Sequence, residues 1–116
     1  MRVELKENVL TVVTGIKKET VDKGIVNLAA KDDKGNEVFV IGTTNSPDKG
    51  EISSMGLLCN TVVDEELAVT IVLPMGTSED QVKAKYGQKL VAAEKYCEKI
   101  AANAEKDMAA VDELFS

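Results

Sequence analysis

The polar side chains best suited to chemistry gather in one stretch, residues 42–54, which reads GTTNSPDKGEISS. Its hydroxyl, amide and ammonium groups, together with backbone N–H groups next to glycine, can bind an anionic or polar small molecule or the backbone of a partner protein. The alternative is that the stretch is only a solvated hairpin loop. The candidate ligand-binding residues are Thr43, Thr44, Asn45, Ser46, Lys49, Ser53 and Ser54.

The residue types on which most enzymes depend are scarce. The chain has no His, and Arg2 is its only Arg. The lack of His excludes Ser-His-Asp and Cys-His nucleophile systems, and a single Arg leaves little for a phosphoryl-transfer clamp. Neither a P-loop nor a dinucleotide-binding fingerprint is present. We therefore expect no catalytic residues and no cofactor, and a protein that is not an enzyme.

The two cysteines and the acidic runs are the remaining candidates for chemistry. Cys59 and Cys97 stand in apolar surroundings without a secretory signal, so we expect free, buried and unreactive thiols, with a bridge between them as the alternative. The acidic run at residues 32–37, DDKGNE, resembles a calcium loop faintly but is too short for the 12-residue ligand pattern. It also lies where a hairpin turn is needed, so we expect no metal site.

The charge and hydropathy of the chain limit the classes of partner that it can bind. The chain has 20 acidic and 14 basic residues, a net charge of −6, and the acids are interleaved with lysines. That pattern is typical of a solvated mixed surface and excludes the basic track that nucleic-acid binding needs. No apolar run of 18 residues and no signal peptide is found, so we expect a cytoplasmic protein that does not bind membranes.

The pattern of apolar residues predicts one α+β domain over residues 1–116. Apolar, β-branched stretches separated by short polar turns predict an antiparallel β-meander of five to six strands over residues 1–74. Gly35 marks a hairpin turn, and Leu67–Leu73 is apolar on both faces, which is typical of a central strand.

Residues 78–115 predict one long C-terminal amphipathic helix. Apolar residues recur there with a mean spacing of about 3.7 residues, close to the helical period. Ser78 and Gln81 have the spacing of a capping box at its start. The alternative is a break at Gly87 or Asn103 that folds the tail back as a hairpin.

The length of this helix predicts self-association. Its 38 residues would reach about 55 Å, whereas strands of the expected length span roughly 20–27 Å. The apolar stripe would therefore continue past the sheet, and a second copy of the chain is the economical cover for it. The expected oligomer interface comprises Tyr96, Ile100, Ala104, Met108, Val111 and Phe115.

Two functions remain open. The first is a non-enzymatic, homo-oligomeric interaction or assembly protein. The second is a protein that binds or sequesters a small molecule, such as a nucleotide or another anionic metabolite, near residues 42–54 or between subunits. The layout of an antiparallel sheet followed by a C-terminal helix resembles that of several small phage-encoded ligand-sequestering proteins, which would imply the second function and a viral origin.

Overall fold

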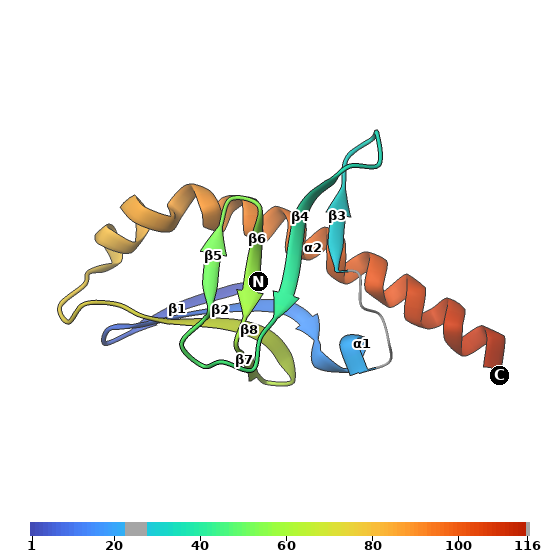
Figure 1. The fold of residues 1–116 in the computed structure, drawn as a ribbon, viewed down its shortest axis with the longest axis horizontal. Helices are drawn as coiled ribbons and strands as arrows, with labels where there is room; N and C mark the ends of the chain where they lie inside the picture. Colours follow the sequence, from blue (N-terminus) through green and yellow to red (C-terminus); the bar gives the residue numbers. More distant parts are fainter. Residues whose placement is uncertain (23–27, 116) are drawn as a thin grey trace.

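The computed structural model describes the backbone of residues 1–22 and 28–115, and the side chains of residues 1–22 and 28–103. The molecule measures 52 × 30 × 20 Å along its principal axes, and the longest helix lies along the longest of them (Figure 1). The elements in chain order are β1 (Arg2–Lys6), β2 (Val9–Lys17), α1 (Lys18–Asp22), β3 (Ala29–Lys31), β4 (Glu37–Thr43), β5 (Glu51–Ser53), β6 (Gly56–Cys59), β7 (Thr61–Val63), β8 (Glu66–Val72) and α2 (Glu79–Phe115).

The described strands form two four-stranded sheets. The first has the order β1-β2-β8-β7, and all its pairings are antiparallel. The second has the order β3-β4-β6-β5, in which β4 and β6 are parallel. In Figure 1 the strands of the second sheet stand across the long axis of the molecule, whereas β1, β2 and β8 run along it.

Tight turns at polar residues connect the hairpins, as the sequence predicts. Asp64 and Glu65 both have positive φ, +52° and +68°, and form a two-residue loop between β7 and β8. That backbone conformation matches the twist of the flanking strands. At the β3–β4 hairpin, Gly35 has φ +82° and its N–H donates to the carbonyl of Asp32 (3.0 Å).

The prediction of an α+β fold with a long C-terminal helix is confirmed, but the strands differ from a meander of five to six. The apolar run at residues 55–63 divides at Asn60 into β6 and β7, which lie in different sheets. The short strand β5 forms within the predicted loop, and the polar segment after β2 forms α1. One of the apolar stretches expected to form a strand of the meander, residues 24–30, begins outside the described residues, and its described part contributes to β3.

The helix α2 begins as predicted and is continuous. Ser78 N–H donates to Oε1 of Gln81 (2.8 Å), and Gln81 N–H donates to Oγ of Ser78 (3.2 Å), which is the reciprocal pair of a capping box. Helical backbone then runs through both Gly87 and Asn103, so the chain does not fold back at either residue.

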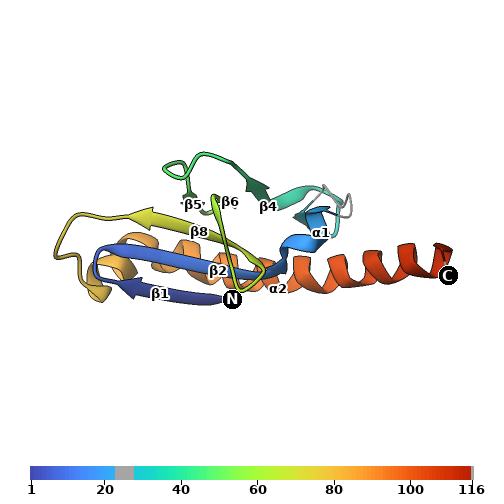
Figure 2. The ribbon, with the colours of Figure 1, turned by 90° about the horizontal axis from the view of Figure 1, so that it is seen from below.

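The core lies where the two sheets and α2 meet. The helix contacts β2 of the first sheet and both outer strands of the second sheet, β5 and β3. Seen from below in Figure 2, β2 and β8 run lengthwise beside α2, which continues past them toward the C-terminus. Its buried stripe comprises Val82, Tyr86, Ala93, Cys97 and Ile100.

Candidate functional site

The residues predicted to bind a ligand do not form one surface. Thr43, Thr44 and Asn45, at the end of β4, line a cleft. Ser53 is the last residue of β5, and Ser54 follows it in the turn that leads to β6. Thr43 pairs with Cys59 at one end of β6 and Ser53 pairs with Gly56 at the other end, so the structure brings together only the first part of the predicted set.

Several of the predicted hydroxyl groups shape the backbone. Thr44 Oγ1 accepts a hydrogen bond from Ser46 N–H (3.2 Å), and Lys49 N–H donates to the carbonyl of Ser46 (3.1 Å). Ser53 Oγ donates to the carbonyl of Gly56 (3.1 Å), which closes the turn between β5 and β6. Local turns of this kind are the usual role of Ser and Thr in loops.

Asn60 fixes this loop to the first sheet, a role that the sequence did not reveal. Its Nδ2 donates to the carbonyls of Pro47 (2.6 Å) and Thr70 (2.9 Å), and its Oδ1 accepts from Thr70 N–H (2.8 Å). Gly50 fits closely beside it, since a Cβ there would lie 2.7 Å from both Asn60 Nδ2 and the Thr70 carbonyl. The available signal was a single amide residue inside the apolar run LLCNTVV.

The cleft at the end of β4 has a volume of about 370 Å³ and is half open to solvent. Its apolar part includes Cys59 and Leu67, which are 2% and 4% exposed. The remaining lining comes from α1, from the end of β4 and from β7: Lys18, Val21, Asp22, Thr43, Thr44, Asn45, Asn60, Thr61 and Val62. The cleft therefore joins an apolar floor to a polar rim, as small binding sites commonly do.

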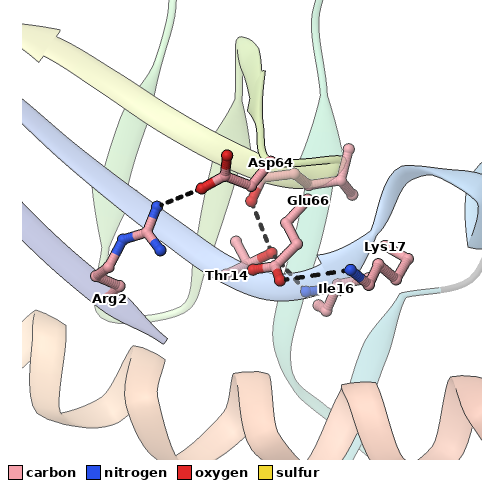
Figure 3. A network of polar contacts seen from close by, with 7 residues as sticks. Arg2, Thr14, Ile16, Lys17, Asp64 and Glu66 are labelled. Atoms are coloured by element: carbon pink, nitrogen blue, oxygen red, sulfur yellow. Dashed lines mark hydrogen bonds and ion pairs between the residues drawn. The ribbon is translucent and has the colours of Figure 1, made fainter.

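A second depression of about 340 Å³ adjoins this cleft. The two share Lys18, Asp22 and Val62, and the second is also lined by Lys17, Glu19 and Glu65. Figure 3 shows Lys17 Nζ in contact with Glu66 Oε2, at 3.8 Å. Within the described part of the chain no other charged group of this depression forms an ion pair, so its lining holds three carboxylates, Glu19, Asp22 and Glu65, and the ammonium group of Lys18 outside any ion pair.

The two cysteines are free and deeply buried, as expected from their apolar neighbours. Burial raises the pKa of each thiol from about 9 to about 12. The nearby Cys97 thiol contributes further to the raised pKa of Cys59. A thiol with so high a pKa holds its proton at neutral pH, and the thiolate is the nucleophilic form.

The turn at residues 32–36 uses its carboxylate for backbone hydrogen bonds. Asp32 Oδ1 accepts from the N–H groups of Asn36 and Lys34, both at 2.9 Å. The hydrogen bond from Asn36 N–H is the main reason why the pKa of Asp32 is lowered. Among the described residues no three His, Cys, Asp or Glu side chains are grouped as a metal site, and no helix is both long and apolar enough to cross a membrane.

Two residues of the expected oligomer interface pack inside their own chain. Tyr96 is half-buried and stacks on Phe39 of β4, and Ile100 is only 3% exposed. The sheets thus reach further along α2 than strand length alone suggested, because the helix crosses the whole width of the second sheet. The side chains of Ala104, Met108, Val111 and Phe115 lie outside the described residues.

The geometry thus gives a cleft at the end of β4 with apolar and polar lining, an apolar helix face buried as far as Ile100, and two protonated thiols. Comparisons of the chain with protein-family models, with curated proteins and with solved structures found no match.

Proposed function

We propose that this chain is a non-enzymatic assembly protein that associates with a second copy of itself through the C-terminal turns of α2. The observation that carries the proposal is where burial stops along the described part of α2. Ile100 is the last fully buried residue on the described part of the helix, and Ala102 and Asn103 are exposed. The sequence continues the same stripe at Ala104, Met108, Val111 and Phe115, with spacings of 4, 4, 3 and 4 after Ile100.

An apolar stripe that continues past Ile100 favours burial against a partner. Leaving a Met, Val or Phe side chain in water instead of burying it forfeits roughly 1.5–3 kcal/mol for each. Among the described residues, the apolar strand faces pack against α2 as far as Ile100. A second copy supplies an identical apolar face, and a two-fold axis lets each helix cover the other. The small side chains of Ala101 and Ala104 would allow the two helices to approach closely.

The charged residues near the C-terminus favour an antiparallel arrangement of the α2 helices of the two copies. Residues 104–116 contain four acids and one lysine, so two parallel copies would place like charges side by side. An antiparallel crossing near residue 106 would instead place Lys99 of one copy beside Glu113 of the other. Lys99 is exposed on the described part of α2 and is free to make that contact without losing core packing.

The test compares substitutions on opposite sides of the helix by light scattering at micromolar concentration. We expect a wild-type dimer, a monomer for Met108→Glu, and a dimer for Lys106→Glu, because residue 106 is turned about 200° from residue 108. Circular dichroism checks that each variant keeps its helix.

A charge swap tests the antiparallel geometry. Lys99→Glu and Glu113→Lys should each weaken the dimer severalfold, and the two changes together should restore it. A wild-type monomer whose C-terminal turns still resist proteolysis would refute self-association.

A further inference from the structure

The most informative unassigned feature is the free edge of β7. Among the described strands, β7 is an outer strand of the first sheet and pairs with β8 alone. Val62, at its centre, is 42% exposed and lines both the cleft beside β4 and the depression beside α1. An unpaired strand edge offers a row of backbone donors and acceptors to another extended chain.

The register of the hairpin shows which backbone groups are free. Val63 pairs with Glu66 across the two-residue loop, so this is the hydrogen-bonded pair that closes the hairpin. The next pair, Val62 and Leu67, is then a non-hydrogen-bonded pair whose N–H and C=O groups point away from each other. The Leu67 carbonyl accepts a hydrogen bond from Thr14 Oγ1 of β2 (2.8 Å), which confirms that it points to the opposite side. The N–H and C=O of Val62 consequently point outward from the sheet, along its free edge.

The two depressions differ in chemistry. The cleft beside β4 has the apolar residues Leu67, Cys59 and Val21 in its lining and a single carboxylate, Asp22. The depression beside α1 is lined by three carboxylates, those of Glu19, Asp22 and Glu65, and by the ammonium groups of Lys17 and Lys18. Because Lys17 is paired with Glu66, the second depression keeps an excess of negative charge. The first therefore suits an apolar side chain and the second a cationic one.

We propose that the edge of β7, together with the two depressions that Val62 lines, binds an extended peptide segment of another protein. This segment adds a strand to β7 at Val62. The segment carries an apolar residue and, two positions away, a Lys or Arg. Side chains two residues apart on a strand point to the same face and are separated by about 6.6 Å, so one peptide can place a side chain in each depression. Backbone pairing supplies affinity, and the two depressions supply specificity.

The proposal is separate from self-association through α2. It concerns a different edge of the molecule, and a variant of β7 should leave the oligomeric state unchanged. Light scattering on each β7 variant therefore distinguishes a failure of this proposal from a failure of the proposed dimer.

The experiment selects peptides from a displayed library of random linear heptapeptides on immobilised wild-type protein. The recovered peptides are synthesised with a fluorescent label, and their binding is measured by anisotropy. We expect recovered sequences in which a basic residue stands two positions from an apolar one. Replacing that basic residue with Glu should weaken binding at least tenfold.

Proline substitutions on the two edges of the same sheet give a matched pair. Val62→Pro removes the outward N–H of β7 and should weaken binding at least tenfold. Val3→Pro removes an outward N–H from β1, at the opposite edge, where Val3 is also 42% exposed and forms a pair of the same kind with Val12. That control should bind as the wild type does, and both variants should fold because proline is tolerated on an edge strand when its nitrogen faces outward.

The double variant Glu19→Gln/Asp22→Asn tests the acidic depression without touching β7. It should weaken the binding of peptides that carry the basic residue several-fold, and it should leave the binding of the peptide with Glu at that position unchanged. If Val62→Pro does not fold, this variant and the amide shifts of Val62 and Thr44 on titrating the wild-type protein with peptide still decide the question. No recovered peptides, equal binding by Val62→Pro, or thermal stabilisation only by members of a nucleotide and metabolite panel would overturn the proposal.

Discussion

Phe39 of β4 and Tyr96 of α2 stack with their ring centroids 5.3 Å apart and their planes inclined by 21°. Phe39 is fully buried, whereas Tyr96 is half-buried and has the Lys95 ammonium 5.3 Å from its ring centroid. This stack joins the second sheet to the middle of the helix. It also gives Tyr96, which stands among polar side chains in the sequence, an apolar partner within its own chain.

The stack predicts that ring packing at residue 96 stabilises the subunit. Tyr96→Ala should lower the free energy of unfolding by about 2–3 kcal/mol, because it removes a half-buried ring and exposes Phe39. Tyr96→Phe keeps the ring and should change the free energy of unfolding by less than about 0.5 kcal/mol. Urea denaturation followed by circular dichroism measures both, and the exposed neighbour Glu94→Ala is the control. An effect of Tyr96→Ala no larger than that of Glu94→Ala would show that the stack does not hold the sheet to the helix.

Asn60 should contribute more to the free energy of unfolding than its position near the surface suggests. Asn60→Ala removes three hydrogen bonds and leaves backbone groups of Thr70 and Pro47 unpaired, so we expect a loss of about 2–3 kcal/mol in the free energy of unfolding. Asn45→Ala changes an exposed amide in the same loop and should cost less than about 0.5 kcal/mol. Thermal or urea unfolding separates the two, and equal effects would contradict the role assigned to Asn60.

The buried thiols predict a loss of stability at high pH. Each cysteine has a folded-state pKa of about 12, above its unfolded value near 9, so the folded state holds a proton that the unfolded state releases between these values. The stability contributed by the protonated thiols is therefore complete below pH 9 and is lost as pH rises toward 12. The slope reaches about 1.4 kcal/mol per pH unit for each thiol.

Urea denaturation between pH 8 and pH 11 measures this slope. The variant Cys59→Ala/Cys97→Ala is the reference, since it retains every other titrating group. The wild type should lose stability more steeply than the reference, and native protein at pH 8 should resist alkylation by iodoacetamide. Parallel curves, or rapid alkylation of either thiol without unfolding, would contradict their burial.

The sequence by itself determined the elements whose signals are local. The spacing of apolar residues from Val82 onward and the Ser78–Gln81 pair define α2, because helical periodicity and capping depend only on neighbours within a few residues. The turns at Gly35 and Asp64 were readable for the same reason, since glycine and Asp tolerate positive φ. Burial of both cysteines also followed from their apolar neighbours.

Only the tertiary structure decided how these elements are placed. An apolar run such as residues 55–63 has no internal sign that its two halves join different sheets; the division at Asn60 depends on partners in Pro47 and Thr70, which are 13 and 10 residues away. The parallel pairing of β4 with β6 and the crossing of α2 over β5 and β3 likewise depend on contacts between distant segments. The cleft beside β7 is lined by residues from four separate segments between Lys18 and Leu67, so it exists only once those contacts form. Local periodicity fixes which face of an element is apolar, but the choice of the surface that covers that face is made by packing.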